Sequence, residues 1–216
     1  MERIIDIVLP AIPQTLVMVI ASTIIALLIG LPLGIILTTT RPGGLTESTR
    51  LYSILDGIIN VLRSFPFVIL MIVVFPLSRL IVGKSYGTAA MIIPLSLSAA
   101  PFVARLMEGY FTQVDQGIIE AAKSMGSTKR EIIFKVLIPE AMPMVVTGIT
   151  MTIINVIGYS AMAGVMGGGG LGDVANRYGY QRNEPLILWS AVIVIIILVQ
   201  IVQFVGNKIA DRIDRR

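Results

Sequence analysis

The chain has 216 residues, of which 55% are hydrophobic and only 14% charged, and it contains neither Cys nor His. This composition is typical of one integral membrane unit rather than of a string of soluble domains. Without Cys and His there are no disulfides or thiolates, and the commonest metal ligand and general base is missing, so we expect no metal site and no catalytic residue. The net charge of +4 does not indicate nucleic acid, because the basic residues cluster beside apolar segments, where they set membrane orientation.

Apolar segments long enough to cross a bilayer recur along the chain. We predict five membrane spans, at residues 14–37, 64–80, 87–106, 141–163 and 185–205, with an amphipathic segment at 49–63 before the second. The first span is uncharged, and at 1.5 Å per residue it is longer than the ~30 Å hydrocarbon layer. The expected fold class is all-α integral membrane, with five transmembrane helices in a single domain over 1–216.

The distribution of Lys and Arg orients these spans. If the N-terminus lies outside and the C-terminus inside the cell, most basic residues fall in cytoplasmic segments, as the positive-inside rule requires. The loop between the third and fourth spans, about residues 110–139, is then the one long cytoplasmic loop.

This cytoplasmic loop contains the stretch "EAAKSMGSTKREIIFKVLIPE", residues 120–140. Gly126 is expected to stop a first short helix, and Thr128 with Glu131 has the spacing of a capping box that opens a second. Pro139 is expected to end that second helix. Apolar residues recur at helical spacing in both helices: Ile118, Ile119, Ala122 and Met125, then Ile132, Ile133, Val136 and Leu137.

The apolar stripe of this predicted helical hairpin has two interpretations. It could cover the base of the chain's own helix bundle. It could instead insert into a groove on a cytoplasmic partner.

Two further stretches invite functional interpretations. "GVMGGGGLGD", residues 164–173, lacks the Lys-Ser/Thr of a phosphate-binding loop and does not follow a strand, which argues against nucleotide binding. It is either a flexible turn with close backbone packing or a re-entrant gating segment at the outer mouth. In "RSFPF", residues 63–67, we favour an interfacial anchor for Arg63 over a pathway residue. Arg105 and Glu108 are expected to pair.

Polar and polarisable residues lie near the end of the fourth span in "GYSAMAG", residues 158–164. Ser160 has no His or Lys partner in the pattern, so a nucleophile is not indicated. Tyr159, Ser160 and Met162 are candidates for lining or gating a solute pathway, although a Met on a helix usually packs in a core.

The cytoplasmic loop also carries a resemblance to a known family. Its Glu120, Ala121, Ala122, Gly126 and Pro139 resemble the EAA motif (E-A-A-x3-G-x9-I-x-L-P) of ATP-binding cassette importer permeases, with conservative changes at its two aliphatic positions. Together with RSFPF, SAAPFVARLME (98–108), GYSAMAG and GGGGLG, nearly the whole chain resembles the methionine-import permeases of this superfamily.

The resemblance implies the fold of a type I importer domain and a transporter of the bacterial inner membrane. Its implied partners are a second copy of the chain, two cytoplasmic ATPase subunits, an extracytoplasmic methionine-binding protein or lipoprotein, and membrane lipid. ATP would be bound by the ATPase subunits, and the chain itself would hold no cofactor. The motif residues Glu120, Ala121, Ala122, Gly126 and Pro139 would couple the permease to the ATPase. The stereochemistry of the methionine stays open.

Other functions remain as alternatives to methionine import. The chain could serve an importer of another amino acid. A carrier driven by an ion gradient is disfavoured, because no Asp or Glu lies deep inside a predicted span. A membrane-embedded enzyme that uses Ser160, or the cations Arg63 and Arg105, would have few chemical groups available.

Overall fold

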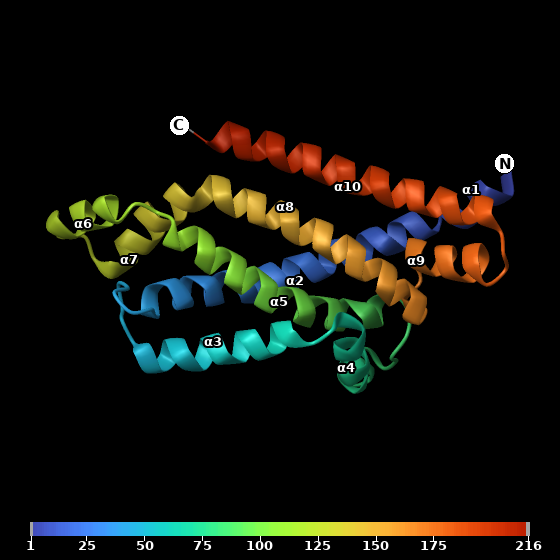
Figure 1. Cartoon of the computed structure of the whole chain (residues 1–216), viewed down its shortest axis with the longest axis horizontal. Helices are drawn as coiled ribbons and strands as arrows, with labels where there is room; N and C mark the ends of the chain where they lie inside the picture. Colours follow the sequence, from blue (N-terminus) through green and yellow to red (C-terminus); the bar gives the residue numbers. More distant parts are fainter. Residues whose placement is uncertain (1, 215–216) are drawn as a thin grey trace.

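The structure, a computed structural model, describes residues 2–214, and every regular element in that range is helical. The elements along the chain are α1 (Glu2–Val8), α2 (Ala11–Thr40), α3 (Thr49–Ser64), α4 (Phe67–Val82), α5 (Thr88–Thr112), α6 (Gln116–Ser124), α7 (Lys129–Glu131), η1 (Ile132–Leu137), α8 (Ile138–Ala163), η2 (Gly164–Gly168), α9 (Gly170–Val174), η3 (Ala175–Tyr180) and α10 (Pro185–Ile213). The prefix η marks helix with the wider π turn. The long helices α2, α5, α8 and α10 run along one another, with α6 and α7 at one end and α1 and α9 at the other (Figure 1).

Within residues 2–214, four helical segments are long and apolar enough to cross a membrane: Glu2–Thr40, Thr88–Thr112, Lys129–Gly168 and Pro185–Ile213. A fifth candidate is the pair α3 and α4, which meet at a bend of 105°. The predicted five spans and all-α membrane fold are therefore confirmed when this bent pair is counted as one span.

The second span differs from its prediction. We expected one span over 64–80 after an amphipathic segment at 49–63, but α3 runs beside the bundle and α4 turns sharply away from it (Figure 1). The 16 residues of α4 measure about 24 Å, which is less than a straight span needs. The bend follows from Pro66, because a proline disfavours the helical conformation in the residue before it. Phe65 is accordingly extended, with φ −70° and ψ 125°.

The closest helix pair is α2 with α5, and glycines bring the two backbones together. A Cβ added at Gly30 would lie 2.6 Å from the Cβ of Val103, and one at Gly34 would lie 2.6 Å from the Cβ of Met107. Small residues spaced in this way allow membrane helices to approach closely without a solvent-driven hydrophobic effect.

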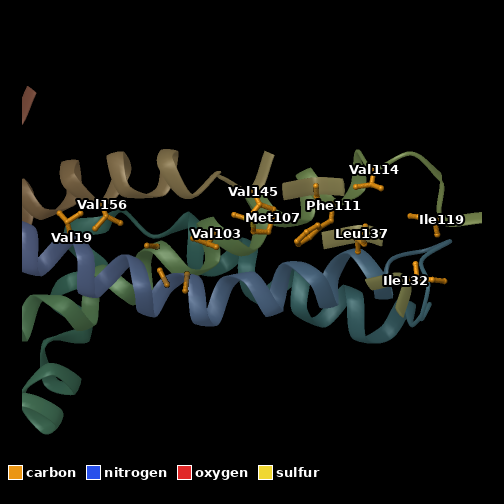
Figure 2. Close-up of a cluster of buried hydrophobic side chains, with 14 of the residues drawn as sticks. Val19, Val103, Met107, Phe111, Val114, Ile119, Ile132, Leu137, Val145 and Val156 are labelled. Atoms are coloured by element: carbon orange, nitrogen blue, oxygen red, sulfur yellow. The ribbon is translucent and has the colours of Figure 1, made fainter. Parts of the chain in front are cut away.

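One apolar core runs through most of the length of the bundle. It extends from Val19 and Val156 among the long helices to Ile119 and Ile132 in the loop between the third and fourth spans (Figure 2). The loop helices are thus packed on the same core as the spans, so they are held in a fixed position on the bundle.

Candidate functional site

The first helix of the loop is closed at both ends by local sequence. The carboxylate of Asp115 accepts a hydrogen bond from the amide of Gly117 at 2.7 Å and so caps the start of α6. At its end, Gly126 has a φ of +80°, the amide of Ser127 donates to the carbonyl of Ala122 at 3.1 Å, and the amide of Gly126 donates to that of Lys123 at 2.9 Å. These two bonds form a Schellman motif. The predicted glycine stop is confirmed.

The second helix begins with the predicted capping box. The amide of Glu131 donates to the hydroxyl of Thr128 at 3.3 Å, and the amide of Thr128 donates to the Glu131 carboxylate at 3.0 Å. Lys135 adds an ion pair to the same carboxylate at 3.0 Å. The hydrogen bond from Lys135, followed by those from Thr128, lowers the pKa of Glu131 to about 2.

The prediction that Pro139 ends this helix is wrong. Helix continues from Lys129 past Pro139 to residue 165, where non-helical backbone angles at Met166 and Gly167 interrupt it, and Pro139 lies at the start of α8 inside that stretch. A proline normally loses one amide hydrogen bond and clashes with the carbonyl four residues earlier. Here the preceding segment η1 has the wider π turn, and the amide of Ile138 bonds to the carbonyl of Ile133, five residues back. The changed hydrogen-bond register absorbs the proline, so the loop helix and the fourth span are continuous.

Most of the apolar stripe packs on the chain's own bundle. Ile119, Ala122, Ile132 and Leu137 are buried in the long core. The first interpretation of the stripe, a cover for the base of the bundle, therefore describes these side chains. They are not available to a partner.

At the hairpin, by which we mean residues 116–137, Met125 of the predicted stripe is exposed together with residues outside the stripe. Glu120, Ala121 and Gly126 are exposed, and Met125 and Phe134 are 79% and 66% exposed. Phe134 was not singled out from the sequence, although its place outside the apolar stripe was a usable signal. The structure brings Glu120, Ala121 and Gly126 together on one short helix and its cap, with Ala122 on the inner side and Pro139 at the base of α8.

At the opposite end of the bundle, the glycine-rich stretch is held by hydrogen bonds. The amide of Gly170 donates to the side-chain oxygen of Gln14 at 2.7 Å, and the amide of Leu171 donates to the hydroxyl of Thr15 at 2.9 Å. A Cβ at Gly172 would lie 2.1 Å from the carbonyl oxygen of Ala161. Glycine is required here for close backbone packing, which confirms that part of the first interpretation.

The three pathway candidates of the fourth span do not share one face. Ser160 is buried, and its hydroxyl donates to the carbonyl of Ile157 at 2.7 Å. Tyr159 stacks on Phe67, the first residue of α4, with ring centroids 4.5 Å apart. Met162 is 48% exposed on the outer surface of the subunit. The hydroxyl of Ser160 therefore has its hydrogen-bond partner within its own helix, while Met162 faces away from the bundle.

The predicted pair of Arg105 and Glu108 is present, with 2.7 Å between the guanidinium and the carboxylate. The same guanidinium also pairs with Asp56 of α3 and donates to the side-chain oxygen of Asn60 at 3.0 Å. Glu108 is buried, so Arg105 supplies the charge that this carboxylate needs.

Residues 30–216 match the family of binding-protein-dependent transport system inner membrane components. The chain is 46% identical over 211 residues to the "Probable D-methionine transport system permease protein MetI" of Vibrio cholerae, covering 98% of this chain and 94% of the relative. It is 43% identical to the methionine import system permease protein MetP of Bacillus subtilis, over 84% of this chain and 82% of the relative. A solved structure of the MetNI methionine ABC transporter in an inward-facing conformation has a chain that superposes with a TM-score of 0.97 at 39% identity, covering 100% of both chains.

Proposed function

The chain belongs to the family of binding-protein-dependent transport system inner membrane components, and from this premise we propose that it forms the membrane pathway of an ATP-driven methionine importer. It is a multi-pass protein of the inner membrane and a permease subunit of an ABC transporter. The transport of methionine is supported by relatives that are named for it in two distant bacteria.

The observation that carries the mechanism is the exposed tip of the hairpin. The buried stripe fixes α6 and η1 on the bundle, so a force applied to the hairpin would be transmitted to the spans instead of bending a loose loop. The hairpin exposes apolar Met125 directly before the glycine cap and apolar Phe134 on η1, the chemistry of a segment that inserts into a hydrophobic groove. ATP hydrolysed by a partner subunit would act on the permease at this point.

We assign the ATPase contact to Glu120, Ala121 and Gly126, with Ala122 and Pro139 supporting it from inside. Ala122 packs on the inner side of α6, and Pro139 lies at the start of α8, where the second helix of the hairpin continues into the fourth span. The hairpin would face the cytoplasm and the N-terminus the outside, since α1 and the hairpin lie at opposite ends of the bundle (Figure 1).

The assembly would hold two copies of this chain, two ATPase subunits and an extracytoplasmic methionine-binding protein at the outer end. Up to five spans in the described part of one chain are few to enclose a solute path, and a two-fold symmetric dimer doubles that number. Among the three pathway candidates we favour Met162, because its side chain is exposed. An exposed thioether can contact a soft apolar solute, or the Met162 of the second copy of the chain. Tyr159 would support the path through its stacking on Phe67, and Ser160 would pack inside the subunit.

Reconstitution into liposomes with the ATPase subunit and the binding protein tests the proposal. We expect uptake of labelled methionine only when ATP is present on the side of the membrane that carries the ATPase subunits, that is, inside liposomes whose ATPase subunits face the lumen. This uptake should persist when ionophores collapse the ion gradients. Uptake without the ATPase subunit that follows an ion gradient would instead identify a secondary carrier.

Competition distinguishes the remaining alternatives. Unlabelled methionine is expected to inhibit uptake more strongly than other amino acids. If another amino acid inhibits more strongly, that amino acid is the solute in place of methionine. An ATP-independent chemical activity of the purified chain that Ser160→Ala abolishes would favour the membrane enzyme.

A further inference from the structure

A pocket of about 270 Å³ lies where the end of α3 meets α5. Its lining includes Arg63 of α3 and Phe102, Arg105, Leu106, Tyr110 and Gln113 of α5. This volume is at the small end of ligand pockets, which begin at roughly 300 Å³, and it combines an apolar wall with a few polar groups as such pockets do.

The two cations of the pocket have different roles. Arg105 is already paired with Asp56 and Glu108, so its charge is neutralised inside the protein. Arg63 makes no ion pair and no hydrogen bond with any residue in the range 2–214. A guanidinium has five donors in a planar fork that matches a carboxylate. Arg63 is therefore the group of this pocket that is available to an anion.

The lining of the pocket also includes a hydrogen-bond acceptor, the side chain of Gln113. The side-chain amide of Gln113 donates through Nε2 to the carbonyl of Gly109 at 3.2 Å. This bond leaves its Oε1 atom as an acceptor for a donor in the pocket. Phe102 and Leu106 add apolar surface to the same lining.

We propose that this pocket binds a small zwitterionic amino acid with an apolar side chain. Its carboxylate would bind Arg63, its ammonium would donate to Oε1 of Gln113, and its side chain would pack against Phe102 and Leu106. The inference rests on the proposed function, which makes the ligand methionine on its way to the cytoplasm. A pocket that pairs both charges of the solute lowers the cost of holding a zwitterion beside apolar helices.

Equilibrium dialysis of labelled methionine against the detergent-solubilised permease–ATPase complex, without binding protein, tests this site. Arg63→Gln is expected to weaken binding about tenfold or more, because it removes a charge-assisted hydrogen-bond pair, while Arg63→Lys loses less. Arg50→Gln is the matched control, since Arg50 is exposed on the same helix and outside the pocket. Gel filtration of the intact complex shows that each variant is folded.

A second arm tests the ammonium contact with 4-(methylsulfanyl)butanoate, which is methionine without its amino group. The wild type should bind this analogue more weakly than methionine, and Gln113→Leu should bind the two about equally. If wild type shows no saturable methionine binding, or if Arg63→Gln binds like the control, the site is refuted.

The shared anion chemistry leaves a lipid phosphate as the competing ligand of Arg63. Native mass spectrometry with phosphatidylglycerol distinguishes it: loss of bound lipid in Arg63→Gln, with methionine binding unchanged, would make Arg63 a lipid anchor and overturn the proposal. Failure of this site leaves ATP-dependent methionine uptake by the wild type intact. Failure of the proposed function abolishes that uptake, so the two results are distinguishable.

Discussion

Replacing Gly126 with alanine separates the cost of backbone strain from the cost of blocking a partner. Gly126 has a φ of +80°, a conformation that costs an L-residue about 1–2 kcal/mol. A Cβ at this position meets nothing within 4 Å inside the chain. The folded subunit therefore loses only the strain energy. The added methyl group projects into the space from which an ATPase subunit would approach.

Gly83 provides a matched control for this strain. It ends α4 with a φ of +84°, and an added Cβ there also meets nothing within 4 Å. Gly83→Ala should thus cost a similar 1–2 kcal/mol in stability, while leaving the hairpin unchanged. Thermal unfolding of both purified complexes gives the stability term for each variant.

The functional assay is ATP hydrolysis stimulated by the binding protein, measured beside methionine uptake in the same liposomes. We expect Gly126→Ala to lose most of the stimulation and uptake, and Gly83→Ala to retain both. A bulky Gly126→Leu should strengthen the loss. Equal stimulation in the Gly126→Ala and Gly83→Ala complexes, at equal stability, would refute the assignment of the hairpin tip as the ATPase contact.

Three other predictions concern the two ends of the bundle. Gly172→Ala should prevent recovery of folded protein in a gel-filtration assay, because the added Cβ overlaps neighbouring backbone, whereas Gly158→Ala, which meets nothing within 4 Å, should not. Thr15→Val should cost about 1–3 kcal/mol by leaving the buried amide of Leu171 without its acceptor, and faster hydrogen exchange at that amide would report it; unchanged exchange would contradict this reasoning. The pKa of Glu131 is depressed in the folded state, so its contribution to helix capping is present above its usual value of 4.5 and is lost as the pH falls toward 2. Protection from hydrogen exchange at the Thr128 amide, which donates to this carboxylate, should show this pH dependence in the wild type and not in Glu131→Gln, and an identical profile in both would exclude the carboxylate as its source.

Those features of the hairpin that are determined by residues close together in the sequence were predictable. The glycine stop at Gly126 and the capping box of Thr128 and Glu131 depend on groups within five residues of one another, so spacing alone identifies them. The assignment of the apolar stripe was harder, because the same pattern suits a partner's groove and the chain's own core. Only the packed structure shows that Ile132 is buried and Phe134 is exposed.

Features that depend on competing backbone preferences or on distant contacts were not predictable. Both Pro66 and Pro139 disfavour a regular helix, yet the chain bends by 105° at the first and continues through a π turn at the second. The sequence does not say which response tertiary packing will select. Likewise, Arg63 and Gln113 meet in one pocket only because α3 folds back beside α5.

The helix that runs from Lys129 through Pro139 to residue 165 has a mechanical consequence. At 1.5 Å per residue it is about 55 Å long, and it ends at Met166 and Gly167, whose φ and ψ are not helical. Beside that end, the tight glycine packing around Gly172 holds the chain in place. With this end as a fulcrum, each degree of tilt displaces the opposite end, at Lys129, by about 1 Å. A displacement of the hairpin by a few ångströms would therefore tilt the fourth span by a few degrees, with the π turn of η1 as the joint between the hairpin and the span.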